Sequence, residues 1–147
     1  MRESWDSYFM NIAKVVSTRA TCPRNQLGIV ITKDNRIVST GYNGSPPGQP
    51  HCDDIGCEMV DNHCVRTVHG ECNAIYQAAK LGVSLEGSTM YMHSEIYPGP
   101  PCYYCAKAIV AAGIKRVVVY DFTETAYTRT IDFFKECGII LDVVSRG

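Results

Sequence analysis

Two short motifs, well separated in the chain, constrain its fold more than any other feature. The first is His69-Gly70-Glu71 and the second is Pro101-Cys102-Tyr103-Tyr104-Cys105. One imidazole and two thiolates can fill three corners of a zinc tetrahedron and leave the fourth corner for water. A Cys-x-x-Cys pair alone is weaker, because it also occurs in redox proteins and at structural zinc sites. Together the motifs predict a fold that brings two distant segments to one metal ion.

Glu71 follows His69 by two residues, so it can face such a metal ion without binding it. Zinc lowers the pKa of a bound water toward neutrality, and the resulting hydroxide can attack an electrophilic ring carbon. We expect Glu71 to take the proton of that water, to protonate the neighbouring ring nitrogen and finally to protonate departing ammonia. The alternative is a closed structural zinc site with Cys72 as the fourth ligand. On a helix, however, Cys72 would point away from the direction of His69.

The composition indicates one globular domain over residues 1–147. The chain is 46% hydrophobic and 20% charged, which is ordinary for a soluble globular protein. Its net charge of −1 gives no electrostatic reason to bind nucleic acid. No apolar run approaches the roughly 20 residues that span a bilayer, and the N-terminus lacks the apolar core of a secretory signal. We therefore expect a cytoplasmic protein with neither a nucleic-acid nor a membrane partner.

The chain has 8 cysteines, more than a single metal site uses. Thiols stay reduced in the cytoplasm, so metal ligation explains them better than disulfides. Several lie in or near the Pro- and Gly-rich segment 43–67, where a closed second zinc site could order the loop. The alternative is that these cysteines pack as small hydrophobic residues. The candidate ligands of the second zinc are Cys22, Cys52, Cys57, His63 and Cys64.

The hydrophobic pattern alternates between helical and strand periods. Helices are predicted over 4–18, 68–81, 106–112 and 124–137, and strands over 27–32, 37–42, 89–92, 117–120 and 139–144. This order predicts an α/β fold, a three-layer α-β-α sandwich with a mixed sheet of about five strands flanked by helices. Both zinc motifs fall where a central helix begins. The positive end of the helix dipole favours the thiolate forms of Cys102 and Cys105 there.

On these motifs the chain resembles the zinc-dependent cytidine deaminase superfamily and, within it, the deoxycytidylate (dCMP) deaminases. The similarity extends from about Cys22 to Val144. The segments that carry it are Cys22-Pro23-Arg24, Gly41-Tyr42-Asn43-Gly44-Ser45-Pro46, His63-Cys64-Val65-Arg66-Thr67, His69-Gly70-Glu71-Cys72-Asn73-Ala74 and Pro101-Cys102-Tyr103-Tyr104-Cys105-Ala106-Lys107. The His, Glu and Cys elements mark only the superfamily, whereas the Gly-Tyr-Asn-Gly-Ser-Pro loop and the upstream cysteines look specific to the mononucleotide branch.

The resemblance implies a function as well as a fold. It implies zinc-dependent hydrolysis of dCMP to dUMP and ammonia, which supplies the precursor for thymidylate synthesis. It also implies a homo-oligomer, commonly a hexamer, that dCTP with Mg²⁺ activates and dTTP inhibits. Some relatives carry a second zinc, with ligands that match Cys22 and Cys52. The alternatives are another deaminase of the superfamily, acting on a nucleoside or a nucleic-acid base, and a zinc-stabilised binding module without turnover.

Two residues are candidates for holding a nucleotide. Arg24 can pair with a phosphate, although a solvated loop arginine explains its charge equally well. Asn43 lies in a glycine-containing loop and resembles the sugar-binding asparagine of the superfamily. Its alternative role is a hydrogen bond to its own backbone in a turn. Candidates for effector contacts at a subunit boundary, each with plain surface exposure as the alternative, are Gly44, Arg66 and Lys80.

Two features depart from the family pattern. Gly70 occupies a position that is usually alanine. The segment from Met92 to Gly99 makes the approach to Pro101 longer than expected, and its contribution to base contacts is open because it borders the metal site. His93 within this segment could stack on a base, but we expect it on the loop surface, since loop residues are usually solvated.

Overall fold

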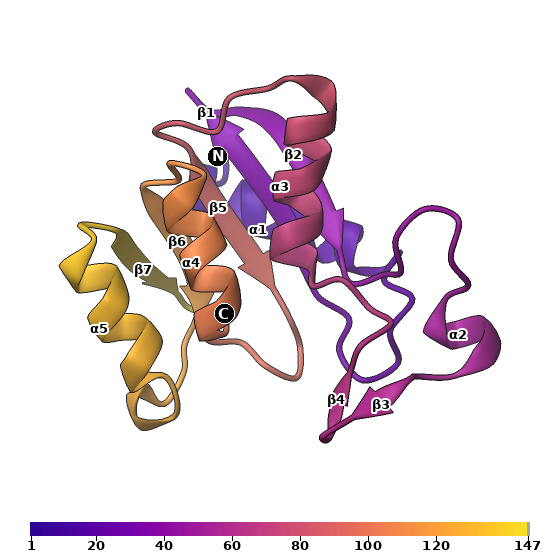
Figure 1. The fold of residues 1–147 in the computed structure, drawn as a ribbon. Helices are drawn as coiled ribbons and strands as arrows, with labels where there is room; N and C mark the ends of the chain where they lie inside the picture. The colour runs from indigo at the N-terminus through magenta and orange to yellow at the C-terminus, as the bar shows by residue number, and fades with distance from the viewer. Residues whose placement is uncertain (147) are drawn as a thin grey trace.

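A computed structural model describes residues 1–146 and shows a five-stranded sheet between helices (Figure 1). The strand order is β2-β1-β5-β6-β7. The strands are β1 (Gly28–Lys33), β2 (Arg36–Tyr42), β5 (Thr89–His93), β6 (Arg116–Tyr120) and β7 (Ile140–Val144). β1 runs antiparallel to β2 and β5, whereas β5, β6 and β7 are mutually parallel. The predicted mixed sheet is therefore confirmed.

Helices cover both faces of this sheet. α1 (Trp5–Ser17) packs on one face, and α3 (Gly70–Leu81), α4 (Tyr103–Ala111) and α5 (Thr128–Glu136) pack on the other (Figure 1). This arrangement confirms the three-layer α-β-α class. The helix predicted over 124–137 is instead divided into the 3-10 helix η1 (Glu124–Ala126) and α5, because Tyr127 between them leaves the helical conformation. Among the described residues, no helix combines the length and apolar character that a membrane span requires.

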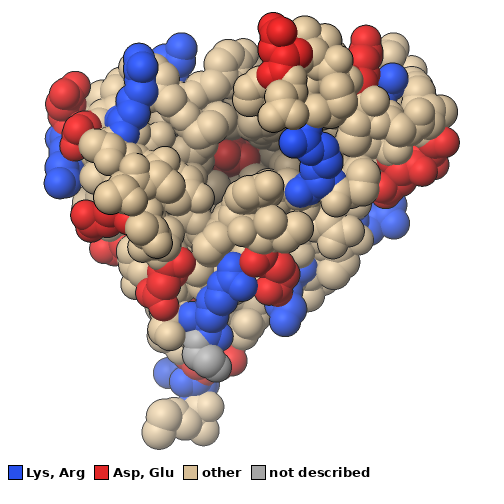
Figure 2. Space-filling model, turned by 90° about the horizontal axis from the view of Figure 1, so that it is seen from below, with Lys and Arg blue, Asp and Glu red and all other residues tan. Residues whose placement is uncertain are grey.

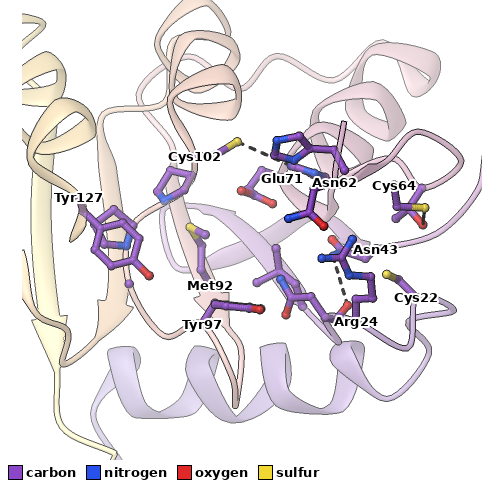
Figure 3. Close-up of a pocket in the computed structure, with 18 residues that line it drawn as sticks. Cys22, Arg24, Asn43, Asn62, Cys64, Glu71, Met92, Tyr97, Cys102 and Tyr127 are labelled. Carbon is purple, nitrogen blue, oxygen red and sulfur yellow. Dashed lines mark hydrogen bonds between the residues drawn. The ribbon is translucent and has the colours of Figure 1, made fainter. Parts of the chain in front are cut away.

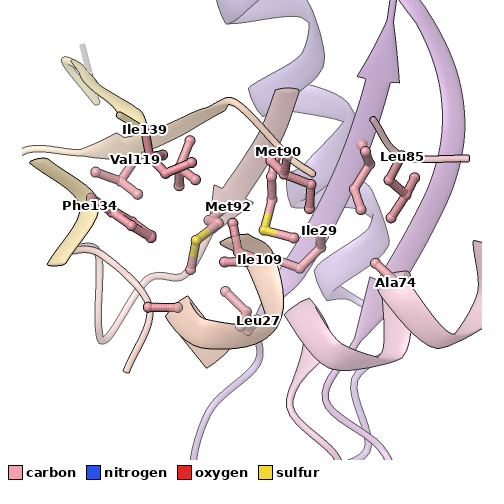
Figure 4. Packing of buried hydrophobic residues seen from close by; sticks show 14 of the residues in the cluster. Leu27, Ile29, Ala74, Leu85, Met90, Met92, Ile109, Val119, Phe134 and Ile139 are labelled. Atoms are coloured by element: carbon pink, nitrogen blue, oxygen red, sulfur yellow. The ribbon is translucent and has the colours of Figure 1, made fainter. Parts of the chain in front are cut away.

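Alternating side chains along the strands build a hydrophobic layer on each face. The layer beneath α3, α4 and α5 is shown in Figure 4 and includes Ile29, Ile31, Met90, Val117, Val119, Ala74, Ala78, Ile109 and Phe134. The layer beneath α1 includes Val30, Tyr91, Val118, Phe9, Met10 and Ala13. Neighbouring residues of a strand face opposite sides of a sheet, so adjacent residues divide between the layers. Burial of each large aliphatic or aromatic side chain contributes about 1.5–3 kcal/mol to this packing.

α1 begins after the cap residue Ser4 and is held to the sheet by charge as well as packing. Ser4 Oγ accepts a hydrogen bond from Ser7 N at 3.1 Å, which satisfies a free N–H of the first turn. Arg116 on β6 pairs with Asp6 at 2.8 Å and with Asp142 on β7 at 2.7 Å. The hydrogen bond from Arg116 holds the pKa of Asp6 below its usual value.

The two central helices begin at the end of the sheet where β2 and β5 end. Gly41 on β2 allows α3 to lie directly on the strand, because a Cβ there would come within 2.5 Å of Gly70 O and Ala74 N. α4 begins after β5 and the connection 94–102. As a result, the residues that immediately precede α3 and α4 lie next to each other.

Segment 43–67, predicted as a long loop, projects beside this end of the sheet (Figure 1). It contains the short helix α2 (Cys52–Ile55) and a hairpin of β3 (Met59–Val60) and β4 (His63–Cys64). Asp61 and Asn62 at the hairpin turn have positive φ angles of 49° and 64°, a conformation that Asp and Asn tolerate better than most residues. Both residues of β3 are exposed, so the hairpin has little core of its own.

Candidate active site

His69, Cys102 and Cys105 meet at the starts of α3 and α4, as the sequence predicts. His69 directly precedes α3, Cys102 directly precedes α4, and Cys105 lies in the first turn of α4. His69 Nδ1 lies 3.3 Å from Cys105 Sγ and 3.7 Å from Cys102 Sγ (Figure 3). All three donor atoms lie within 4.8 Å of one another.

These separations match those of a zinc tetrahedron. Zinc bonds of about 2.0 Å to nitrogen and 2.3 Å to sulfur place neighbouring ligand atoms roughly 3.3–3.8 Å apart. The observed nitrogen–sulfur distances of 3.3 and 3.7 Å fall within this range. No fourth His, Cys, Asp or Glu of the described residues joins the group. The cluster therefore fits a metal ion with one position free for a non-protein ligand, the arrangement of catalytic zinc sites.

Contacts within the cluster shift the pKa values of its three side chains. The hydrogen bond with Cys102 raises the pKa of His69 to about 9. Hydrogen bonds from Cys105 and His69 lower the pKa of Cys102 to about 4. Hydrogen bonds with Cys102 and Cys72 raise the pKa of Cys105. These shifts favour the thiolate form of Cys102, the form that binds a metal ion.

Glu71 lies in the first turn of α3. Figure 3 shows its carboxyl group beside Cys102 and beside the imidazole of His69, which a dashed line connects to Cys102. The residue is only 3% exposed. Burial raises the pKa of its carboxyl group. Among the described residues, Oε1 of Glu71 has no hydrogen-bond partner. A buried carboxyl group with a raised pKa and a free oxygen is suited to accept, hold and release a proton.

The cluster opens into a pocket of about 420 Å³, a size typical of small-molecule sites. Figure 2 looks onto this face and shows a hollow with a carboxylate at its floor and a basic side chain at its rim. Glu71 is the acidic residue of the lining, and Arg24 is the basic one. The rest of the lining includes Asn25, Asn43, Asn62, Met92, Tyr97 and Tyr127.

Asn43 lines the pocket, but its amide also bonds within the protein. Its Oδ1 accepts a hydrogen bond from Gly70 N at 2.6 Å, and its Nδ2 donates to Asn25 O at 3.2 Å. Asn43 therefore joins the end of β2 to the start of α3 and keeps one amide hydrogen for a ligand. The same contact explains the crowding at Gly70, where a Cβ would lie 3.3 Å from Asn43 Oδ1 and 3.2 Å from Ile29 Cγ1.

Sequence reasoning missed the role of Asn73. Its Nδ2 donates to Tyr42 O at 2.8 Å, to Val68 O at 3.2 Å and to Gly44 O at 3.4 Å. These bonds anchor the chain on both sides of segment 43–67 to α3. The only signal in the sequence is an asparagine near the start of a predicted helix, where such side chains often bond to nearby backbone.

Cys72 lies closer to the cluster than the sequence analysis expects. Its Sγ is 3.7 Å from Cys105 Sγ, and the residue is 4% exposed. The expectation used helical spacing from His69, but His69 precedes α3 in an extended conformation. Cys72 nevertheless stands outside the group of three mutually close donors, so it leaves the fourth metal position open.

The structure brings together three of the five candidate ligands of the second zinc. The Sγ atoms of Cys52, Cys57 and Cys64 lie within 4.8 Å of one another, and those of Cys52 and Cys64 are 3.6 Å apart. Although burial acts in the opposite direction, backbone N–H groups lower the pKa of Cys64 to about 6. Cys22 is buried and His63 is exposed; both line the pocket and neither belongs to this group.

The other candidates are placed as follows. Arg24 is exposed at the pocket, and its Nη1 lies 3.2 Å from Met59 Sδ. Gly44 pairs with Val68 through two backbone hydrogen bonds of 2.9 and 3.2 Å. Arg66 donates to Gly56 O at 3.2 Å and lies 3.6 Å from Glu58, and Lys80 is exposed in the last turn of α3.

His93 is not on the surface, and that expectation is wrong. The residue is 3% exposed at the end of β5. Its Nδ1 lies 2.8 Å from Tyr120 Oη, and its Nε2 lies 3.2 Å from Glu95 Oε1. The ring therefore belongs to the protein interior, because the strand continues one residue further than predicted.

Comparison with known proteins places this site in a family. The model of the cytidine and deoxycytidylate deaminase zinc-binding region matches residues 3–121. ComE operon protein 2 of Bacillus subtilis is 40% identical over 97% of this chain and 72% of its own length. The deoxycytidylate deaminase of Mycobacterium phage D29 is 36% identical over 80% of this chain and 94% of its own length. That of Saccharomyces cerevisiae is 35% identical over 95% of this chain, which spans 44% of the yeast enzyme.

A solved structure agrees with the sequence matches. The crystal structure of dCMP deaminase from cyanophage S-TIM5, in complex with dCMP and dUMP, matches with a TM-score of 0.80 and 27% identity. The match covers 98% of this chain and 99% of the phage chain. The predicted resemblance is confirmed: the chain is a deaminase and belongs to the cytidine and deoxycytidylate deaminase family.

Proposed function

We propose that the chain catalyses the hydrolytic deamination of dCMP to dUMP and ammonia, and so supplies dUMP for thymidylate synthesis. The observation that carries the proposal is the buried carboxyl group of Glu71, which has a free Oε1 and lies beside the His69, Cys102 and Cys105 cluster. The choice of dCMP is supported by similarity to deoxycytidylate deaminases and to a structure solved with dCMP and dUMP.

His69, Cys102 and Cys105 would hold the catalytic Zn²⁺. When bound, zinc acts as a Lewis acid that makes water acidic enough to react at neutral pH. Glu71 Oε1 accepts a proton from the attacking water and delivers it to the ring nitrogen beside the attacked carbon. Glu71 then takes the second proton, from the hydroxyl group now on the ring carbon, and delivers it to the amino group, which leaves as ammonia while the carbonyl forms. Its raised pKa suits this work, because the group must hold the proton between the two transfers.

Arg24 and Asn43 would orient the nucleotide. Arg24 is exposed at the pocket, and its contact with Met59 engages only a thioether sulfur, a weak acceptor. Most guanidinium donors thus remain available for a phosphate group. The remaining amide hydrogen of Asn43 would meet a sugar hydroxyl, while its bonds to Gly70 and Asn25 fix the amide plane.

An ammonia-release assay with dCMP, deoxycytidine, cytidine and dCTP tests this function. We expect kcat/KM for dCMP to exceed that for deoxycytidine by about tenfold to a hundredfold, the effect of one charged hydrogen-bonded pair. Equal rates on both substrates would contradict a nucleotide enzyme and favour a nucleoside deaminase. No ammonia from any of the four would favour a binding module without turnover.

We also propose a second, structural Zn²⁺ at Cys52, Cys57 and Cys64. The distance of 3.6 Å between two of the sulfurs fits ligands of one tetrahedral zinc. The fourth ligand stays open between Cys22 and His63, the other two candidates. Metal analysis of the purified protein decides this point: two zinc ions per chain support the second site, and one contradicts it.

The family resemblance extends the proposal to regulation and assembly. We propose activation by dCTP with Mg²⁺, inhibition by dTTP and a homohexamer. Gly44, Arg66 and Lys80 remain effector candidates, although Gly44 and Arg66 also have partners within the chain. Saturation curves for dCMP with each effector, and light scattering of the protein, test these points. A cytoplasmic location is part of the same proposal, since cysteine ligands must stay reduced.

A further inference from the structure

Arg146, near the C-terminus, holds the segment that follows β5. Its Nη2 donates to Ser94 O at 2.7 Å and to Glu95 O at 3.1 Å, and its Nη1 donates to Glu95 Oε2 at 3.2 Å. The guanidinium group also lies over the Tyr120 ring, 5.0 Å from the ring centroid. One side chain from the far end of the sequence thus contacts two consecutive residues of this segment and the strand beside it. We call this set of contacts the C-terminal clamp.

His93 completes the C-terminal clamp from the protein interior. Its Nδ1 can accept the hydrogen bond of Tyr120 Oη at 2.8 Å while its Nε2 donates to Glu95 Oε1 at 3.2 Å. A neutral imidazole satisfies both contacts, and burial lowers the pKa of His93 in favour of that form. Glu95 is therefore held through one carboxylate oxygen by His93 and through the other by Arg146.

The clamped segment, residues 94–100, forms one wall of the pocket. Tyr97, Gly99 and Pro100 belong to the pocket lining, and the segment leads directly to Pro101 and the metal-ligand candidate Cys102. Within it, Tyr97 N donates to Ser94 Oγ at 3.1 Å. This bond fixes the backbone of Tyr97 relative to Ser94. The side chain of Tyr97 lines the pocket (Figure 3).

Hydrophobic burial contributes little to the order of residues 95–97 in the middle of this wall, whereas Ser94, Gly99 and Pro100 at its two ends are buried. Ile96 is 60% exposed and Tyr97 is 56% exposed, and Glu95 is also exposed. The wall depends instead on polar contacts, and three of these are made by Arg146. Hydrogen bonds to a charged group are stronger than those between neutral groups, although solvent exposure weakens them. Loss of Arg146 therefore removes three contacts of Ser94 and Glu95, while the bonds from Ser94 Oγ to Asn25 Oδ1 at 2.9 Å and from Tyr120 N to Pro98 O at 3.2 Å remain.

We propose that Arg146 is a positioning residue for the deamination, because it fixes residues 94 and 95 and so holds the Tyr97 wall in the conformation that accepts the nucleotide. The substrate in this inference is that of the proposed function; the clamp itself is independent of it. Without the guanidinium group, fewer molecules would have a binding-competent pocket, and the apparent affinity falls in proportion to that fraction. The groups that perform the chemistry would stay in place, since Asn43 and Asn73 secure the start of α3 and Thr130 Oγ1 donates to Pro101 O at 3.0 Å before α4.

The test compares Arg146→Ala and Arg146→Lys with the control Arg36→Ala. Arg36 is an exposed arginine that pairs with Lys33, the last residue of β1. His93 of the clamp pairs with Gly28, the first residue of β1, so Arg36 lies at the opposite end of that strand. We expect Arg146→Ala to raise KM for dCMP by about tenfold and to change kcat by less than about twofold. Arg146→Lys should be intermediate, because an ammonium group cannot reproduce the planar fork of a guanidinium. Arg36→Ala should leave both constants unchanged.

Hydrogen–deuterium exchange of the substrate-free proteins supplies the second measurement. We expect faster exchange in peptides that cover residues 94–100 of Arg146→Ala, with α3 and α4 unchanged. Faster exchange together with a raised KM supports the proposal. Unchanged exchange, or faster exchange with an unchanged KM, overturns it, and so does a loss confined to kcat. If the wild-type protein does not deaminate dCMP, the proposed function is contradicted and KM cannot be compared. The exchange rates of residues 94–100 in wild type and Arg146→Ala then decide alone whether Arg146 fixes the wall.

Discussion

The chain builds two thiol clusters beside one pocket by different means. His69, Cys102 and Cys105 come from the starts of two helices that pack on the five-stranded sheet, and Cys105 is fully buried. The second cluster, Cys52, Cys57 and Cys64, comes from segment 43–67, which projects from the sheet and exposes most of its residues. The two groups lie on different sides of the pocket, as Cys102 and Cys64 show in Figure 3.

The two clusters therefore differ in what holds their ligand atoms in place. The helix starts are fixed by the hydrophobic core, by Asn43 and by Asn73, so the first cluster is ordered by the fold. The second cluster has little buried apolar surface around it, and such segments open locally at low free-energy cost. A metal ion at the second cluster would therefore contribute folding energy, whereas at the first it would contribute chemistry.

Glu71→Gln should have the largest effect and separates chemistry from metal binding within the first cluster. The amide keeps the size of the side chain but cannot accept and release a proton, so we expect ammonia release to fall by about 10³-fold, within the range for loss of a general acid–base group. Zinc content should not change, because Glu71 is not one of the three clustered donors. Enzyme assay and metal analysis of the same sample provide the measurement, and retained turnover would reject the mechanism.

Cys105→Ser and Cys64→Ser should separate the two clusters directly. We expect each variant to lose one zinc and keep the other. Cys105→Ser should lose turnover to the level of Glu71→Gln while its thermal unfolding changes little, because the sheet and helices still hold the site. Cys64→Ser should keep turnover within about tenfold but become sensitive to proteolysis within residues 43–67, since removal of a structural metal releases the fold it stabilises.

Metal analysis, limited proteolysis and the dCMP assay distinguish these outcomes. Two outcomes would contradict the independence of the two clusters: loss of both metals in Cys64→Ser, or cleavage of segment 43–67 by the protease in Cys105→Ser. Either result would show that the clusters form one cooperative unit.

Arg24→Ala tests whether the side of the pocket next to segment 43–67 binds the phosphate group of the substrate. Arg24 contacts Met59 of the same hairpin that carries Cys64. Removing a charged donor should raise KM for dCMP by about tenfold to a hundredfold and leave the kinetics on deoxycytidine unchanged. An equal loss on both substrates, measured in parallel, would show that Arg24 supports the pocket without reading phosphate.

The sequence predicts the first cluster well because its signals are local. Hydrophobic periodicity places the helices, and His69 and Cys102 stand where those helices begin. It fails at His93, whose buried ring lies against Tyr120 of β6, a residue that approaches only when the parallel strands assemble. No periodicity within one segment reports such a contact.

The same limit explains Cys72. Helical spacing describes one helix, whereas the position of Cys72 beside Cys105 results from the packing of α3 on α4. The second cluster shows a further limit. Residue types suggest its ligands, but only the path of segment 43–67 selects Cys52, Cys57 and Cys64 from the five candidates.

Cys72→Ser should have the smallest effect and addresses the feature on which the catalytic interpretation depends, an open metal position. Cys72 touches Cys105 but lies outside the cluster of three donors. If it only packs there, serine should leave the zinc content unchanged and alter kcat by less than about threefold, the scale of a conservative change beside a ligand. If Cys72 were the fourth ligand, Cys72→Ser would instead lose zinc as Cys105→Ser does. The pair of variants thus decides whether the first cluster is open, as catalysis requires, or closed, as in a structural site.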